Sequence, residues 1–280
     1  MKMKKSILAT TLTTIIVTTP ALAWTNGDLP ASSIIFGGSI IHEQENPWQW
    51  NIGKPLEGLN LKFKDGVSEG YITTFKLPLN EKTLLIGKTK NEITSGAAGL
   101  APYVTFTDGI TQQPLVMTND SNKPGRSVVS LAVGDKNNSA SASASASAGT
   151  FQFALASGLL LGQAGYGSGT PANEYMAIAK AGAGSQANGI PTHPDTAENT
   201  KKLISNAFSG IGEALPNWPQ MNIPLGGAGS LETAFTDPQR KGMVSAYGAT
   251  MLAGDGIVKL TTEGMPSEWK SVLSVSVTHN

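Results

Sequence analysis

The chain contains many short segments in which apolar and polar residues alternate with a period of two. In the last of them, Trp269 to Asn280, the residues Leu273, Val275 and Val277 fall on one face. This period is typical of a strand with one buried face. Together with 32 glycines and no cysteine, such segments predict an all-β sandwich or barrel that is held by packing and hydrogen bonds without disulfides.

Other segments of this kind, and one apolar run, are also expected to be strands. The apolar run, Phe151 to Leu161, has the pattern of a strand that is buried on both faces. Gly254-Asp255-Gly256 separates two segments and predicts a hairpin between them. The alternating or short apolar segments are Leu59–Lys64, Tyr71–Leu79, Thr83–Ile86, Tyr103–Thr107, Arg126–Val133, Met243–Leu252 and Ile257–Thr262.

The N-terminus has the layout of a secretory signal peptide. Three lysines precede an apolar run from Ile7 to Val17, and Ala21-Leu22-Ala23 is a small-x-small cleavage site. We therefore expect residues 1–23 to be removed and the remaining chain to be exported. Soon after this site, Ser32 to Ile40 alternates like a strand, although no earlier strand in the chain is available as its partner.

Two segments break the alternating pattern. The serine–alanine segment Asn137 to Phe153 is either a flexible linker or a strand with an alanine face and a serine face. Gly162 to Asn217 is rich in Gly, Ala, Asn and Pro, and we interpret it as an insertion that either binds a ligand or covers a sheet edge. One helix is expected in it, with a capping box at Asp195 and Glu198 and an end at Pro216. Its apolar face would contain Leu203, Ala207, Phe208, Ile211 and Leu215.

The composition argues against several classes of function. Lys and Arg number 20, as do Asp and Glu, so nothing in the net charge predicts a nucleic acid partner. The nucleophile elbow, the paired histidines of a zincin and the phosphate-binding loop are all absent from the sequence. We therefore expect no enzyme, no cofactor and no metal site. A secreted β-sandwich glycan hydrolase stays open as a distant alternative, because carboxylate pairs meet only in space.

The aromatic residues offer two kinds of candidate. Trp48 and Trp50 share one face of a short segment and are expected in the core, although aromatic faces can also stack on sugars. Tyr166 and Tyr175 lie in the irregular region and are candidate glycan contacts. The histidines are scattered and are expected at the surface.

Several segments, taken together, resemble the FaeG-like fimbrial subunits of Escherichia coli K-antigen fimbriae. The resemblance covers both ends of the chain, and residues 137 to 220 match poorly. The segments that carry it are "WTNGDLPASSIIFGGSI", "PWQWNIG", "LLIGKTK", "GLAPYVTFTD" and "SAYGATMLAGDGIVKLTTEGMPSEWKSVLSVSVTHN".

This resemblance implies an incomplete immunoglobulin-like sandwich that lacks its last strand, with a small helix-containing insertion at about 162–217. Residues 24–41 would be the donor-strand extension, and 42–280 the pilin domain. A periplasmic chaperone, an outer-membrane usher and other subunits would be the partners, and the chain would reach a cell-surface fimbria. The function implied is adhesion to host cells, with a host glycan as a further partner; the alternative is a minor, non-adhesive subunit at the tip, base or shaft.

The resemblance also assigns residues to strand exchange. Ser32, Ile34, Phe36 and Gly38 take the donor positions, by alternation along one face. Leu273, Val275 and Val277 would line the acceptor groove, on the edge that the chaperone engages. The register of the donor is left open, because Ile35 stands where the family usually has an acidic residue and one extra residue precedes Ile34.

Overall fold

The computed structural model describes residues 25–26, 29–33, 46–115, 117–120, 122–136, 147–169, 173–180, 189–215, 222–263 and 265–279. Several sequence-based expectations fall outside these ranges. They are the signal peptide, the central part of the serine–alanine segment and the donor positions Ile34, Phe36 and Gly38.

Strands dominate the described residues, as the alternating segments predict. They are β1 (Thr25–Asn26), β2 (Leu29–Ser33), β3 (Trp48–Ile52), β4 (Val67–Glu69), β5 (Ile72–Leu79), β6 (Lys82–Thr89), β7 (Ile93–Ser95), β8 (Pro102–Asp108), β9 (Thr118–Asn119), β10 (Arg126–Asp135), β11 (Gly149–Tyr166), β12 (Glu174–Ala179), β13 (Ile223–Ser230), β14 (Arg240–Met251), β15 (Gly254–Thr261), β16 (Trp269–Lys270) and β17 (Leu273–His279). The helices are α1 (Ala197–Ser209), α2 (Leu231–Ala234) and the 3-10 helix η1 (Phe63–Asp65).

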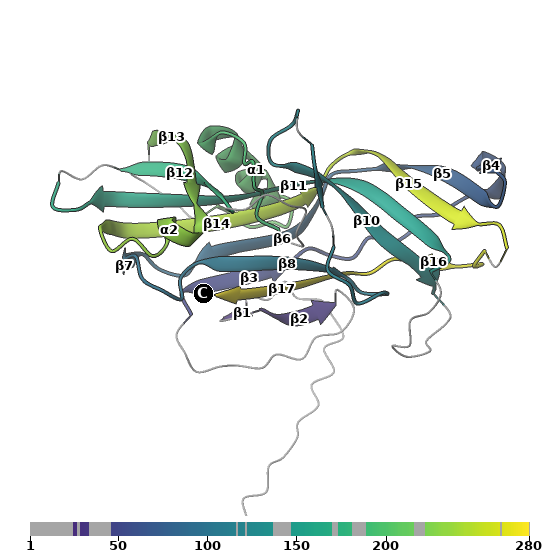
Figure 1. The fold of residues 1–280 in the computed structure, drawn as a ribbon, viewed down its shortest axis with the longest axis horizontal. Helices are drawn as coiled ribbons and strands as arrows, with labels where there is room; N and C mark the ends of the chain where they lie inside the picture. The colour runs from purple at the N-terminus through teal and green to yellow at the C-terminus, as the bar shows by residue number, and fades with distance from the viewer. Residues whose placement is uncertain are drawn as a thin grey trace, which may run out of the picture.

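The large sheet is organised around β11, a strand of 18 residues that runs through the middle of the molecule (Figure 1). Its first half pairs with β10 on one side and β15 on the other, and its second half pairs with β12 and β14. Residues 155–163 are all buried. The prediction of a doubly buried strand at Phe151–Leu161 is confirmed for this stretch, because the sandwich core covers one face of β11 and α1 covers the other.

The hairpin predicted at Gly254-Asp255-Gly256 is wrong. β14 and β15 do not pair with each other; both run antiparallel to β11, one after the other along the same edge. β14 ends opposite Leu155, and β15 begins to pair opposite Gln152. The chain continues from β14 into β15 without reversing its direction, because β11 is long enough to pair with both strands. β5 and β6 follow the same course one strand further out, pairing with β15 and β14 respectively.

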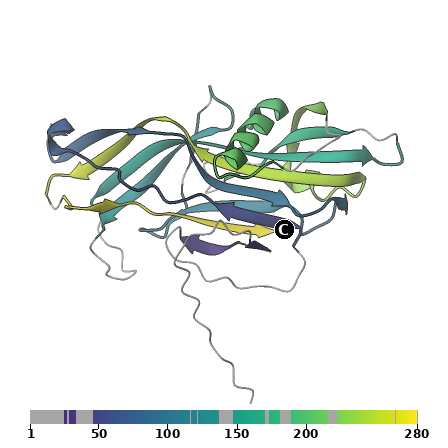
Figure 2. The ribbon, with the colours of Figure 1, turned by 180° about the vertical axis from the view of Figure 1, so that it is seen from behind.

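A sheet of three strands, in the order β2-β17-β8, lies beneath the large sheet in both views (Figures 1 and 2). Alternate residues of β8 and β17 are buried against it. Asp108, at the end of β8, joins the two sheets, since its carboxylate accepts a hydrogen bond of 2.5 Å from the backbone of Ala132 in β10. The same carboxylate accepts bonds from the backbones of Ile110 and Thr111. This buried carboxylate therefore fixes the position of β8, which in turn holds β17.

The predicted helix is present as α1, with different ends. Its N-cap is Thr196 and not Asp195, because the Thr196 hydroxyl accepts a bond of 3.2 Å from the Asn199 backbone. It ends at Ser209, before the predicted end at Pro216. The region expected to be irregular also contains β12 and the end of β11. The buried residues of α1 are Ala197, Thr200, Ile204, Ala207 and Phe208.

α1 packs on the outer face of the large sheet, over β6, β11 and β14 (Figure 1). Two glycines allow this close approach: a Cβ at Gly158 would lie 2.7 Å from the Thr200 methyl group, and one at Gly248 would lie 3.1 Å from Ala207. Sheet residues such as Leu160 and Ala246 complete a second, smaller core beneath the helix. The helix is thus held at a short distance from the sheet, which positions the pocket described below.

Two predictions about local structure have opposite outcomes. Leu59–Lys64 is not a strand: it is irregular and ends in η1, and the carbonyl of Leu59 accepts a bond of 3.1 Å from the Trp269 indole. Trp48 and Trp50 are confirmed in the core, with no exposed surface and with ring centroids 5.1 Å apart in a stacked arrangement.

Gly87 provides a test of this aromatic packing. It lies opposite Trp50 in the β3–β6 pair, and a Cβ added there would approach the indole ring to 2.3 Å. We predict that Gly87→Ala lowers the free energy of unfolding by about 1–3 kcal/mol, because the enclosed ring cannot move aside. Denaturant unfolding of the purified chain measures it. Gly226→Ala is the matched control, since no atom lies within 4 Å of that Cβ; equal stability of the two variants would contradict the packing.

Candidate functional site

Two strand edges of the sandwich face the N-terminal segment. β1 pairs antiparallel with β3, with Thr25 opposite Trp50. β2 pairs antiparallel with β17, with Leu29 opposite Val277 and Ser32 opposite Val275. β3 is at the edge of the large sheet and β17 is in the small one. Residues 25–26 therefore lie along the outer edge of β3 and residues 29–33 along that of β17, and among the described residues no other strand pairs with these two edges.

Of the two edges, β17 has the longer ladder of paired residues with the N-terminal segment. All seven of its residues pair with β8 on the inner side. The predicted groove residues are on its buried face: Leu273 is 7% exposed, Val275 1% and Val277 0%. On the other side the ladder with β2 covers the region from Ser274 to Val277 and contains one irregularity. The edge can thus accept an antiparallel strand, with apolar side chains of β17 turned toward the core.

Aromatic side chains and one histidine connect β3 to the end of β17. The ring of His279 lies 6.3 Å from that of Trp48 and 6.5 Å from that of Trp50. The Asn46 amide nitrogen and His279 Nδ1 are 2.7 Å apart. Because Asn46 Oδ1 accepts the Trp48 backbone N–H, the amide nitrogen is the donor and His279 Nδ1 the acceptor. This bond links a residue just before β3 to the last residue of β17, and His279, which was expected at the surface, is half-buried.

The two tyrosines predicted as glycan contacts lie apart from this edge. Tyr175 is 5% exposed, and the Lys201 ammonium lies 4.6 Å from its ring centroid. The expectation of an exposed ring is wrong for Tyr175, and burial raises the pKa of its phenol. Tyr166, at the end of β11, is 46% exposed. A hydrogen bond to Asp237 and the charge of that carboxylate raise its pKa.

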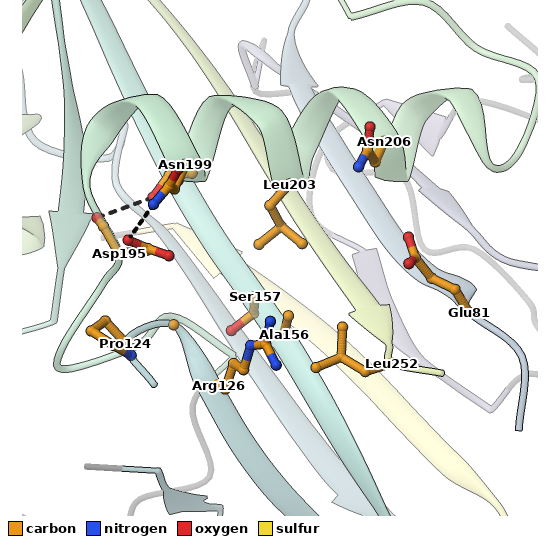
Figure 3. A pocket seen from close by; sticks show the side chains of 12 residues that line it. Glu81, Pro124, Arg126, Ala156, Ser157, Asp195, Asn199, Leu203, Asn206 and Leu252 are labelled. Atoms are coloured by element: carbon orange, nitrogen blue, oxygen red, sulfur yellow. Dashed lines mark hydrogen bonds between the residues drawn. The ribbon is translucent and has the colours of Figure 1, made fainter. Parts of the chain in front are cut away.

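A pocket of about 220 Å³ with polar and apolar lining residues lies beneath α1 (Figure 3). Asn199, Leu203 and Asn206 line it from the helix, at the spacing of one helical face. Ala156 and Ser157 of β11 form its floor, and Arg126 enters from the start of β10. Glu81, from the short link between β5 and β6, closes one end, and Asp195 closes the other.

The pocket and the β3 edge were not found from the sequence. The spacing from Asn199 to Asn206 is a helical signal that could have indicated a polar face on α1. Glu81 and Arg126 come from other parts of the chain, and no spacing connects them to the helix. Likewise, nothing in the segment of Trp48 and Trp50 shows that its outer edge lies near the C-terminal strand.

Comparisons with known proteins show the family of this chain. A family model for major and minor fimbrial subunits matches residues 2–280. The chain belongs to this family. It is 30% identical over 261 residues to the K88 minor fimbrial subunit FaeI of Escherichia coli, covering 91% of this chain and 92% of that protein. It is 31% identical over 110 residues to the K88 fimbrial protein AD and 30% identical over 110 residues to the K88 fimbrial protein AC, both from Escherichia coli, covering 38% of each chain.

Membership of this family decides the class of function. The relatives are fimbrial subunits, so this fimbrial subunit is not an enzyme, and the glycan hydrolase alternative is set aside. The family also places it in a fimbria at the cell surface. Among the described residues, no helix is both long and apolar enough to cross a membrane.

The bond between Asn46 and His279 can be tested by a double-mutant cycle. We predict that Asn46→Ala and His279→Ala destabilise the subunit non-additively, with a coupling of about 0.5–1.5 kcal/mol, the usual net contribution of one hydrogen bond. Denaturant unfolding of the two single variants and the double variant gives this coupling. Effects that add to within the experimental error would show that the bond does not hold the two strands together.

Proposed function

We propose that this fimbrial subunit polymerises by donor-strand exchange. Residues 24–41 of one copy would be the donor, with Ser32, Ile34, Phe36 and Gly38 alternating along the face that enters the groove of the next subunit. The acceptor would be the edge of β17, with Leu273, Val275 and Val277 on the face that receives them. The sandwich of residues 42–280, with its insertion at about 162–217, would thereby be completed by a neighbouring chain.

The observation that carries this proposal is the pairing of residues 25–33 with both β3 and β17. This pairing supports the view that each of these two edges accepts an antiparallel strand. A strand edge exposes unpaired N–H and C=O groups, which cost free energy unless another strand pairs with them. Addition of a strand from a neighbour meets this need, since main-chain bonds give affinity and alternate side chains give specificity.

The same edge explains the proposed route of assembly. After export and removal of residues 1–23, an unpaired β17 would be prone to aggregate. A periplasmic chaperone that lends a strand to this edge would keep the subunit in a competent state, and an outer-membrane usher would then replace that strand by the donor of another subunit. Pairing within one chain, as seen for β2, is the competing state that such a chaperone would prevent.

The comparisons favour one of the two kinds of fimbrial subunit. Similarity to a minor subunit extends over nearly the whole of both chains, whereas the match to the K88 fimbrial protein AD covers 38% of each. This supports a minor subunit. Adhesion to host cells through a glycan is a second candidate function, and the pocket beneath α1 is the observation that favours it.

Two complementary variants test strand exchange. The first lacks residues 24–41, so that it can accept a strand but cannot donate one. The second carries an extra copy of 24–41 after Asn280 on a flexible linker, so that its own groove is filled while its N-terminal donor stays free. We predict that each variant, coexpressed with the chaperone, does not polymerise alone, and that the mixture forms a one-to-one complex. Size-exclusion chromatography with light scattering measures this.

A matched control changes the apolar donor positions. Ile34→Asp and Phe36→Asp are introduced together into the free donor of the second variant. Because burial of each side chain contributes about 1.5–3 kcal/mol, this change should weaken the complex at least about a hundredfold. Polymerisation of the variant that lacks 24–41, at the level of the full chain, would show that the donor lies elsewhere.

A further inference from the structure

We infer that the hairpin of β4 and β5, together with the segment before it, is a second contact between consecutive copies of this subunit, outside the groove. The body of the copy that donates its strand would pack on this hairpin of the copy that accepts it. This inference rests on the proposed strand exchange, to which it adds the position of the neighbouring body. We use the name hairpin patch for the exposed apolar residues Leu56, Phe63, Val67, Tyr71 and Ile72.

Exposed apolar side chains are concentrated in the hairpin patch. Among the described residues, eight large apolar side chains are exposed, and five of them lie between Leu56 and Ile72. Tyr71 is 76% exposed and Phe63 is 68% exposed. Single apolar residues are normal on a protein surface, whereas a cluster of them marks an interaction site. This concentration therefore indicates a surface that another protein covers.

The strand at the outside of this hairpin also has a free edge. β4 is the last strand in the order of the large sheet, all three of its residues are exposed, and among the described residues it pairs with β5 alone. Val67 lies opposite Thr74, and Ile72 precedes Thr74 by two residues, so these side chains share one face of the hairpin. An open strand edge beside apolar side chains favours association with another chain.

The hairpin patch lies at the end of the sandwich where β17 begins. β4 and β16 are at the same end of the long axis in both views (Figures 1 and 2). The Trp269 indole of β16 donates a bond of 3.1 Å to the Leu59 carbonyl, and the Thr262 backbone N–H donates one of 2.8 Å to the Tyr71 carbonyl. Because β16 ends two residues before β17 starts, these bonds hold the patch near the start of β17.

The pairing of β2 gives the direction in which a strand runs along β17. Leu29 lies opposite Val277, and Ser33 lies opposite Ser274. A strand in this position therefore runs from the end of β17 toward its start. A donor strand that takes the same direction brings its last residues to the start of β17, at the end of the sandwich that carries the hairpin patch.

The short connection after the donor keeps the body of the donating copy close to this end. Asn46 follows the last residue of the proposed donor, residue 41, by five positions, and five residues span at most about 18 Å. In each copy Asn46 bonds to His279 at the end of β17, which is the opposite end from the hairpin patch. Consecutive copies are thus arranged head to tail, with the Asn46 end of one against the hairpin patch of the other.

The end around Asn46 has apolar surface that can receive the hairpin patch. Leu100 and Tyr103 are half-buried there and keep part of their side chains exposed. The Leu100 carbonyl accepts a bond of 2.9 Å from the Trp48 indole, and Tyr103 lies opposite Thr278 in the pair of β8 and β17. Both residues are therefore held on rigid strands, so little conformational freedom is lost when a neighbour packs on them.

The experiment compares a groove filled by a whole subunit with the same groove filled by a peptide of residues 24–41. The acceptor is the variant that lacks 24–41, taken from its chaperone complex and labelled with a heavy isotope so that its fragments are distinguished. The whole subunit is the variant with the extra copy of 24–41 after Asn280. Hydrogen exchange is followed by mass spectrometry. We expect acceptor residues 62–72 to exchange at least tenfold more slowly with the whole subunit than with the peptide, and β17 to be protected equally in both.

Substitutions in the acceptor test the hairpin patch directly. Val67→Ser combined with Ile72→Ser should lower at least tenfold the peptide concentration that displaces half of the whole subunit, measured by size-exclusion chromatography. Val128→Ser combined with Ile223→Ser is the matched control, because these residues are also exposed and lie in strands away from the patch. The control should behave like the unchanged acceptor. Tyr71→Lys, in the turn between β4 and β5, should act like the patch variant without altering a paired strand residue.

The outcomes separate this inference from strand exchange. Equal exchange of residues 62–72 in the two complexes, or displacement that the patch substitutions leave unchanged, overturns the inference and leaves strand exchange standing. If the unaltered variants form no complex, strand exchange is rejected and this inference with it. If the patch variant loses its complex with the chaperone but keeps the complex with the whole subunit, the hairpin patch belongs to the chaperone and the inference is likewise overturned.

Discussion

The structure depends on how the outer edges of β3 and β17 obtain backbone hydrogen-bond partners. Both strands have apolar residues in the core, including Trp50 and Val275, so neither can leave the sandwich to find water without exposing apolar surface. Within one chain, residues 25–26 pair with part of the β3 edge and residues 29–33 with part of the β17 edge. Residues 25–26 and 29–33 are therefore part of the β-structure.

The rest of the fold gives this edge a rigid support. β8 pairs with the whole of β17, and the Asp108 carboxylate attaches β8 to β10 of the large sheet. The large sheet is itself stiffened by the long β11, whose two edges carry successive strands. α1 lies on the outer face, where it covers the sheet and forms one wall of the pocket. Strand pairing and the pocket thus occupy separate faces of one scaffold.

Much of this architecture could be predicted, because alternation reports directly on a half-buried strand. β5, β8, β10 and β17 lie close to their predicted ranges, and α1 was indicated by its apolar spacing. The Gly-Asp-Gly segment was misread because a local turn signal does not show that a long neighbouring strand can pair with both flanks. The pocket was missed for a related reason: Glu81 and Arg126 meet Asn206 only through tertiary packing. Tyr175 was expected to be exposed but is buried, because α1, including its Lys201, covers the ring.

The ladder between β17 and β8 has a mechanical consequence. β17 is bonded along all seven of its residues to a strand that is anchored in the other sheet. If donor strands link the subunits of a fimbria, tension along the fibre pulls β17 and its donor lengthwise, so that many backbone bonds are loaded in shear and must fail together. Peeling from one end would break them one at a time and at a lower force. Under that arrangement the ladder between β17 and β8 would resist a lengthwise pull better than a pull that peels it from one end.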